Sequence, residues 1–257
     1  MFENTQFTFN GVHSSVHNCF IGNLGNSSDK ASYSIGGISI TEESFDGQDK
    51  PFFYGKHLSP MTIKFSIFSE NEWTYEKRFA VSSWLLEESY KPLISDDKST
   101  VVYNCICLDS PQKIMIGNIM RGIELTFRCD SPYPYLPEVV STYIVTTPQI
   151  ITIDTRVSNY KKKYKDFEIE FTLSGSNTGI SIKNTTDANR DLTFTGLNTL
   201  ETIYINNRRK EILSSTTLER GSKSNFNWLR LLPNAINSIT ITGACSITFR
   251  YKLPILI

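Results

Sequence analysis

Residues 123–137 read Ile-Glu-Leu-Thr-Phe-Arg-Cys-Asp-Ser-Pro-Tyr-Pro-Tyr-Leu-Pro, and this stretch divides the 257-residue chain in two. Its first seven residues alternate between apolar and polar side chains, which is the pattern of a β-strand with one buried face. Three prolines then fall within residues 130–137. Proline donates no hydrogen bond to a neighbouring strand and stiffens an extended backbone, as a connector between domains requires. We therefore expect one domain over residues 1–135 and a second over residues 136–257.

The sequence on both sides of this connector has the alternation of a sheet protein. β-Branched residues are abundant and alanine is rare, a bias that favours strands. Before the connector the pattern predicts half-buried strands at Phe7–Phe9, which runs into an Asn10-Gly11 turn, at Ile38–Ile40 and at Met61–Ile67. After it, alternating segments begin near residues 168, 180, 191, 202, 238 and 246, the spacing of a sandwich or barrel. The Asn206-Asn207 pair predicts a tight hairpin turn there. The expected fold class is mainly β, with two unlike domains.

One segment before the connector has helical periodicity. Ser69-Glu-Asn-Glu72 matches a capping box, in which the serine hydroxyl accepts from a free backbone N–H and the glutamate reaches back. The side chains expected on or beside the buried stripe of this helix are Trp73, Phe79, Ala80, Trp84 and Leu86. We expect a helix from about Glu72 to Ser89, ended by Lys91-Pro92.

Composition and charge exclude several classes of protein. Twenty-six basic and 26 acidic side chains give zero net charge, so no overall basic field holds nucleic acid. No stretch approaches the ~20 apolar residues of a membrane helix, and the start lacks the features of a signal peptide. We expect synthesis in a cytosol and no membrane insertion. The five cysteines are odd in number and irregularly spaced, which indicates buried free thiols rather than a disulfide framework.

The common catalytic and metal-binding motifs are missing from the sequence. The histidines are His13, His17 and His57; the first two have i, i+4 spacing, but their Gly, Ser and Asn neighbours favour a loop over a metal pair. Cys105 and Cys107 lack a second pair of ligands. Consecutive acids point in different directions and indicate solvated surface: Glu42-Glu43, Glu87-Glu88 and Asp96-Asp97. Polar or solvated loops are also expected at the sequons beginning at Asn26 and Asn184 and at the basic runs Lys161–Lys165 and Arg208–Lys210. We expect no enzyme activity, no cofactor and no metal.

Two aromatic clusters stand out, at Phe52-Phe53-Tyr54 and at Tyr133-Pro134-Tyr135. Aromatic rings supply large contact area at low entropic cost, so they serve in cores, interfaces and sugar platforms alike. Three consecutive aromatics on a strand cannot all face one small pocket. For residues 52–54 this favours packing or a subunit contact over ligand binding.

Taken in order, these features resemble the distal tail proteins of long-tailed bacteriophages. The resemblance covers nearly the whole chain. Its parts are Phe7–Gly11, Ser34–Ile40, Phe52–Gly55, Met61–Phe68 with the Arg78-containing helix ending Ser83-Trp84-Leu85-Leu86, Glu124–Tyr135, and Leu231–Ile241. In the last of these, Asn234 stands where the family usually has glycine. The departure is mild because Asn also reaches left-handed backbone geometry.

The resemblance implies a first domain of β-sandwich or split-barrel type with one helix, and a second, galectin-like β-sandwich. It implies a virion protein of the tail tip, made in the cytoplasm of a host bacterium, that forms a homo-oligomeric ring, commonly a hexamer, around a channel for DNA. Its partners would be the tail tube, other tail-tip proteins and receptor-binding proteins of the baseplate. A closed ring needs one patch to meet a different patch on the next copy. The candidate residues for subunit contact or packing are Phe52, Phe53, Tyr54, Arg78 and Trp84.

Two rival functions remain open at this point. The second domain is a candidate for weak binding of host-wall saccharide, although it has a single tryptophan, Trp228, and no histidine. A cell-wall glycosidase would use acids such as Glu42 or Asp97, because two carboxylates brought together by a fold leave no local motif. The sequence also does not separate an infectious phage from a prophage or a phage-derived bacteriocin.

Overall fold

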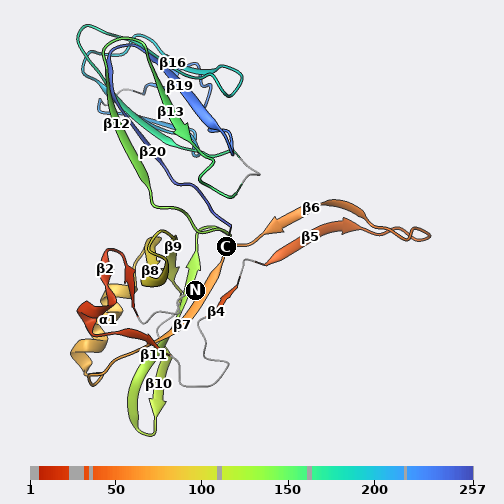
Figure 1. Cartoon of the computed structure of the whole chain (residues 1–257), viewed down its shortest axis with the longest axis vertical. Coiled ribbons are helices and arrows are strands. Elements are labelled where there is room, and N and C mark those ends of the chain that lie inside the picture. Colours follow the sequence, from red (N-terminus) through yellow and green to blue (C-terminus); the bar gives the residue numbers. More distant parts are fainter. Residues whose placement is uncertain are drawn as a thin grey trace. The chain divides into compact units, whose positions relative to one another are not determined.

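The structure, a computed structural model, describes residues 6–22, 32–34, 37–108, 112–160, 164–216 and 219–256. The chain divides into two compact units, Met1–Pro134 and Tyr135–Leu256 (Figure 1). Both are built of β-strands, so the expected mainly β, two-part class is confirmed. The sequon at Asn26, the Ile35-Gly36 pair and lysines 161–163 lie outside the described residues.

The N-terminal unit is a curled antiparallel sheet of nine strands in the order β2-β1-β8-β9-β11-β7-β3, with β10 on β11 and β4 on β7. The strands are β1 Phe7–Phe9, β2 Val12–His13, β3 Phe20–Gly22, β4 Ser32–Ser34, β7 Thr62–Phe68, β8 Lys91–Ser95, β9 Val102–Cys107, β10 Gln112–Ile116 and β11 Ile119–Cys129. The predicted Asn10-Gly11 turn is confirmed, with φ of 50° and 76°. Two successive positive φ values match the twist of a tight hairpin.

Helix α1, Tyr75–Leu85, is shorter than predicted at both ends. The expected capping box is wrong: Thr74 is the N-cap, and its Oγ1 accepts from the Lys77 backbone N–H at 3.3 Å. Ser69 Oγ instead accepts from the backbone N–H of Asn71 and so closes a turn before the helix. Because Thr74 already has extended geometry, with φ −64° and ψ 167°, it supplies a cap nearer the helix.

The buried stripe agrees with the expected one at Trp73 and Trp84 and differs at Ala80 and Leu86, which are exposed. The buried residues of α1 are Val81, Trp84 and Leu85, whereas Phe79 is 66% exposed. The Trp84 ring stacks on Phe7 with centroids 5.4 Å apart, and its indole N–H donates to the Phe9 carbonyl at 2.9 Å. The helix is thereby fixed to strand β1, over a core of aromatic side chains.

The C-terminal unit is a β-sandwich of two antiparallel sheets, in the orders β12-β20-β14-β17-β18 and β13-β19-β15-β16. The strands are β12 Val139–Val145, β13 Gln149–Asp154, β14 Glu168–Leu173, β15 Ile180–Asn184, β16 Arg190–Phe194, β17 Thr202–Asn206, β18 Glu211–Ser214, β19 Ile236–Thr242 and β20 Cys245–Tyr251. Alternate residues of both sheets point inward and form one apolar core, as the alternation predicts.

Two turns of this unit test the sequence interpretation. The hairpin after β17 is present, but Lys210 takes the positive φ, 55°, and neither Asn206 nor Asn207 does. The Asn206 Oδ1 accepts from the Arg209 backbone N–H at 2.9 Å, so this side chain closes the turn without left-handed backbone. Asn234 has φ 53°, which confirms the left-handed geometry expected there.

All five cysteines are buried and none forms a disulfide, as predicted. Within the described residues, no helix is both long and apolar enough to cross a membrane.

Candidate functional site

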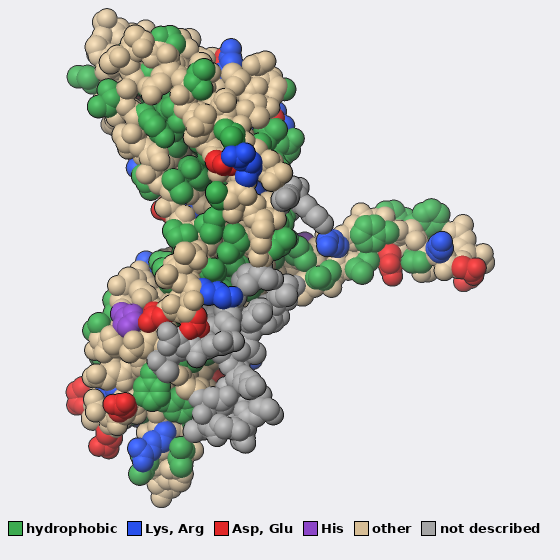
Figure 2. Space-filling model, in the orientation of Figure 1, with side chains coloured by type: hydrophobic (Ala, Val, Ile, Leu, Met, Phe, Trp, Pro, Cys, Tyr) green, Lys and Arg blue, Asp and Glu red, His purple; other side chains and the backbone are tan. Residues whose placement is uncertain are grey.

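Strands β5, Ile38–Glu43, and β6, Phe52–Leu58, form a separate two-stranded sheet, which we call the arm (Figure 1). Among the described residues, no further strand pairs with it. The expectation of a half-buried strand at Ile38–Ile40 is therefore wrong, since Ile38 and Ile40 are 59% and 58% exposed. Figure 2 shows hydrophobic side chains along this hairpin. The alternation is that of a strand with an apolar face, but nothing within the described chain covers that face.

The aromatic cluster at residues 52–54 lies on the arm and contributes nothing to a core. Phe52, Phe53 and Tyr54 are 51%, 63% and 63% exposed. Phe52 meets Phe45 of the connecting loop edge to face, with centroids 5.6 Å apart. The Tyr54 hydroxyl donates to Glu43 Oε2 at 2.9 Å. These contacts order the arm internally and leave most of each ring free.

The strand register places Ile38, Ile40, Phe53 and Leu58 on one face of the arm and Phe52 on the other. Ile38 lies opposite Leu58, and Glu42 lies opposite Phe53, with a bulge between Thr41 and Glu42. Directly opposed residues of an antiparallel pair point to the same side. A single two-stranded hairpin is marginally stable in water. The arm therefore has the composition of a segment that is stabilised by packing against something else.

The other two candidate contact residues lie on α1 and differ from each other. Trp84 is 7% exposed and belongs to the core, where it stacks on both Phe7 and His17. The Arg78 Nε donates to the Thr74 carbonyl at 3.3 Å within the helix. The exposed aromatics of this helix are Tyr75 and Phe79, one turn apart, at 71% and 66%. The expected helical stripe had Phe79 beside its buried residues and did not include Tyr75, so it did not predict this exposed aromatic pair.

The histidines and the acids proposed for chemistry lie in separate elements. His13 Nε2 contacts Asp96 Oδ2 at 3.2 Å, and the His17 ring stacks on Trp84. Burial, and secondarily the charge of Lys77, lowers the pKa of His17. Glu42 lies on the arm, whereas Asp97 Oδ2 accepts from Ser95 Oγ in the short 3-10 turn Asp96–Lys98. The described residues contain no group of three or more side chains suited to a metal ion.

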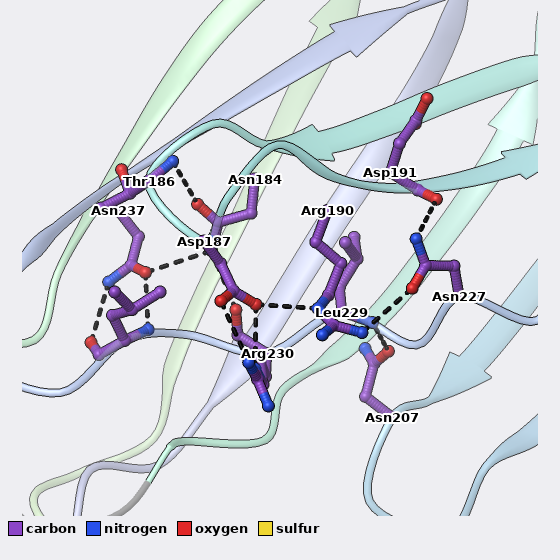
Figure 3. Close-up of polar contacts among 11 residues, drawn as sticks. Asn184, Thr186, Asp187, Arg190, Asp191, Asn207, Asn227, Leu229, Arg230 and Asn237 are labelled. Atoms are coloured by element: carbon purple, nitrogen blue, oxygen red, sulfur yellow. Dashed lines mark hydrogen bonds and ion pairs between the residues drawn. The ribbon is translucent and has the colours of Figure 1, made fainter.

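A cluster of polar side chains lies at one end of the sandwich, around Asp187 (Figure 3). The Asp187 carboxylate accepts from Arg190 Nε at 2.9 Å and from Arg230 Nε and Nη2 at 2.9 and 3.2 Å. Burial alone raises the pKa of Asp187, but the hydrogen bonds from the two guanidinium groups outweigh it, so the pKa lies below its usual value. The carboxylate thus holds two arginines in fixed positions.

Buried amides hold the segment that carries Arg230. Asn184 Nδ2 donates to the Arg230 carbonyl at 2.9 Å and to Asn237 Oδ1 at 3.2 Å (Figure 3). Asn207 donates to the Phe167 carbonyl at 2.8 Å and accepts from the Leu229 backbone N–H at 2.9 Å. The interpretation of the Asn184 sequon as a polar loop is therefore wrong, because this side chain is fully buried. Sequence reasoning missed the cluster since its members are far apart in the chain and form no local motif.

Comparison with known proteins places both units. A family described as phage tail protein N-terminal domain matches residues 2–131. A family described as phage tail C-terminal domain matches residues 136–251. A protein derived from the SPbeta prophage of Bacillus subtilis strain 168, YomH, is 24% identical over 239 residues, covering 86% of this chain and 93% of its own.

Solved structures share the fold over nearly the whole chain. The Dit protein of phage SPP1 superposes with a TM-score of 0.66 at 14% identity. It is described as a paradigm of hub adsorption apparatus in Gram-positive infecting phages. The match covers 96% of this chain and 98% of that one. A chain of the phage P2 baseplate in its activated conformation gives a TM-score of 0.54 at 10% identity, over 96% and 97% of the two chains. With both of its units matched in order along the sequence, the chain belongs to the phage tail protein family.

Proposed function

We propose that this chain is a structural protein of a phage tail tip, a hub that joins the tail tube to the baseplate and the receptor-binding proteins. In this proposal six copies form a ring around a channel for DNA, with the first domain in the ring and the galectin-like second domain available to neighbouring proteins. Family membership and the likeness to a hub protein and a baseplate support the tail-tip role. The observation that carries the ring is the arm, which exposes Phe52, Phe53 and Tyr54.

The arm suits a ring because it presents an apolar face that its own domain leaves uncovered. If the arm of one copy packs on a different surface of the next, the contact is heterologous, and such contacts close into rings when the rotation between copies divides a full turn. Exposed apolar patches of this kind mark interaction sites in soluble proteins. Zero net charge is compatible with a channel that DNA passes through without being held.

The test is self-association of the purified chain with and without the arm's aromatics. The wild-type protein is expected to form rings in negative-stain images, with a mass six times that of the 29.2-kDa chain. Phe52→Ser, Phe53→Ser and Tyr54→Ser together should yield a folded monomer. The matched control replaces two exposed residues of the second unit, Ile144→Ser and Ile150→Ser, at 80% and 66% exposure, and should still form rings.

Two results would contradict the proposal. One is a wild-type chain that stays monomeric at high concentration and forms no ring beside tail partners. The other is an arm variant that assembles as the wild type does. Lysis of bacterial walls by the purified chain would instead favour the glycosidase alternative, in which Glu42 or Asp97 acts as an acid.

A further inference from the structure

A hollow of about 280 Å³ opens beside the polar cluster of the second unit. Its volume is close to the lower end of the about 300–1,000 Å³ that small-ligand sites occupy, so it has room for a small ring rather than a large ligand. The residues that give it chemical character are Asp166, Arg190, Lys210, Phe226, Trp228 and Arg230. They come from separate parts of the chain that the sandwich brings together.

The charge of this hollow is positive. Among the described residues that line it, Arg190, Lys210 and Arg230 carry positive charge and Asp166 carries negative charge. Asp187 behind the two arginines neutralises one further charge, which leaves a net charge of one positive unit. An anionic group is therefore favoured over a neutral or cationic one, and a single anionic group is matched better than a long polyanion.

The guanidinium groups are preorganised and retain donors. Arg230 uses Nε and Nη2 on Asp187, and its guanidinium carbon lies 3.6 Å from the centroid of the Tyr164 ring. Arg190 uses Nε on Asp187 and Nη1 on Asn227. Among the described contacts this leaves Nη1 of Arg230 and Nη2 of Arg190. Donors held in place before binding lose little freedom when a ligand arrives.

An aromatic wall stands next to these donors. Phe226 is 54% exposed, and its ring lies 6.5 Å from that of Trp228. Phe226 has φ 53°, a left-handed geometry that is unusual for a bulky residue. Two hydrogen bonds fix the turn. The Phe226 backbone N–H donates to Ser224 Oγ at 3.0 Å, and the Trp228 backbone N–H donates to the Phe226 carbonyl at 3.1 Å. Strain of this kind persists where the surrounding structure imposes it, and here it presents a ring to solvent at the hollow.

From this combination we infer that the hollow binds a saccharide unit that carries an anionic group, a phosphate or a carboxylate. The guanidinium groups and Lys210 donate hydrogen bonds to the anionic group, and the rings of Phe226 and Trp228 pack against the apolar face of the sugar. A nucleic-acid site would need a tract of cations that follows several phosphates, and one net charge is too little. None of the lining residues belongs to the arm, so failure of the binding test would leave the proposed ring untouched, and the reverse also holds.

Saturation-transfer NMR on the full chain tests the inference with matched pairs of ligands. Glucose 6-phosphate and glucuronic acid are compared with glucose, which lacks the anionic group. Inorganic phosphate, which lacks the ring and has no C–H protons to detect, is tested as a competitor of the charged sugars. Comparing glucose 6-phosphate with glucuronic acid shows whether the site prefers a phosphate or a carboxylate. We expect saturation transfer to at least one of the charged sugars and binding of glucose and of inorganic phosphate weaker by about tenfold or more.

The decisive variant is Phe226→Asn, because Asn tolerates positive φ. It should fold at least as stably as the wild type and yet bind the charged sugar about tenfold more weakly. Leu200→Asn is the matched control: Leu200 is also exposed, at 71%, with φ 61°, and it lies outside the hollow. This control should keep full affinity. Lys210→Gln should weaken the charged sugar while leaving glucose unchanged.

Several outcomes would overturn the inference. They are equal binding of glucose and its charged relatives, equal binding of inorganic phosphate, tighter binding of a short oligonucleotide, and unaltered affinity in Phe226→Asn. Absence of saturation transfer to either charged sugar would also overturn it.

Discussion

The arm and the polar cluster meet solvent in opposite ways. The arm exposes the large apolar side chains of residues 38–58 and has no core of its own. The cluster, in the second unit, holds a buried carboxylate and buried amides in hydrogen bonds of its own, as with Asp187 between two partly exposed arginines. Exposed apolar patches mark sites where another molecule binds, whereas a buried hydrogen-bonded network stabilises one conformation. The arm is therefore the part of the described chain that the proposed ring would cover, whereas the network around Asp187 is formed within the second unit.

The largest effect is expected where the second unit buries an ion pair. Glu201 and Arg220 contact through two bonds of 2.6 and 2.7 Å, with side chains 0% and 7% exposed. Glu201→Gln leaves a buried guanidinium without its counter-charge and should cost about 3–5 kcal/mol of unfolding free energy. Chemical denaturation measures this loss of unfolding free energy, and hydrogen exchange in β17 shows where it acts. Glu170→Gln, at the exposed Arg250 pair, is the control and should cost less than about 1 kcal/mol.

The same pair predicts an acid dependence. Burial raises the pKa of Glu201, but the hydrogen bonds from Arg220 and its neighbours outweigh this and bring the pKa down to about 2 from 4.5. The folded state therefore binds this proton less readily than the unfolded state. The stabilisation is complete above pH 4.5 and is lost as the pH falls towards 2. The stability difference between wild type and Glu201→Gln should shrink over that range, and a constant difference would contradict the assignment.

The next effect concerns the attachment of α1 in the first unit. Trp84→Phe removes the indole donor to the Phe9 carbonyl and leaves part of the buried space of the indole ring unfilled. The loss should be about 1–3 kcal/mol, measured by thermal denaturation with hydrogen exchange at β1. Tyr75→Phe on the exposed side of the helix, at 71% exposure, should change stability by less than about 0.5 kcal/mol. Equal effects of the two changes would show that the indole bond is unimportant.

A smaller effect, of opposite sign, is expected at Lys165. Its ammonium is buried without a hydrogen-bond acceptor among the described residues and lies 4.0 Å from the centre of the Tyr160 ring. Lys165→Met should therefore stabilise the second unit, by about 1 kcal/mol after loss of the cation–π contact. Destabilisation by this change would mean that the ammonium is satisfied.

The pH dependence at Lys165 follows from desolvation, which lowers its pKa to about 8 from 10.5. The unfolded chain keeps this proton more readily, so the wild type gains stability as the pH rises from 8 to 10.5. The advantage of Lys165→Met should be greatest below pH 8 and should decrease as the pH rises from 8 towards 10.5. Comparing the two proteins at each pH cancels the titration of the remaining groups.

The smallest effect on stability is expected on the arm. Ile38→Ser with Ile40→Ser alters two exposed residues and should change the unfolding free energy of the isolated chain by less than about 0.5 kcal/mol. The same change should weaken self-association, as measured by mass in solution. A large loss of stability in the isolated chain would show that the arm packs on its own domain and would remove the contrast with the cluster.

Local chemistry made part of the fold predictable from sequence. Alternation located the main strands, and Asn10-Gly11 specified its turn because positive φ is a property of the residues themselves. The helix boundary was missed because Ser69 and Thr74 are both good caps and only tertiary context chooses between them. The exposed state of Ile38 was missed since alternation describes a strand's two faces without saying what covers them.

The candidate sites were harder to predict because they depend on contacts between distant residues. The 52–54 aromatics were recognised as a contact or packing cluster, but only the strand pairing places them on an uncovered hairpin. Asp187 and Arg190 give a weak local signal by their spacing of three, whereas Arg230 joins them from 43 positions along the chain. The positive φ of Phe226 has no signature in its residue type.

The buried thiols bear on how such a protein survives outside a cell. Burial raises the pKa of Cys19 and Cys245 to about 11 and of Cys129 to about 12. Oxidants and disulfides react with the thiolate, which is scarce at neutral pH when the pKa is so high. In air-saturated surroundings these three thiols should therefore be slow to oxidise and slow to form cross-links.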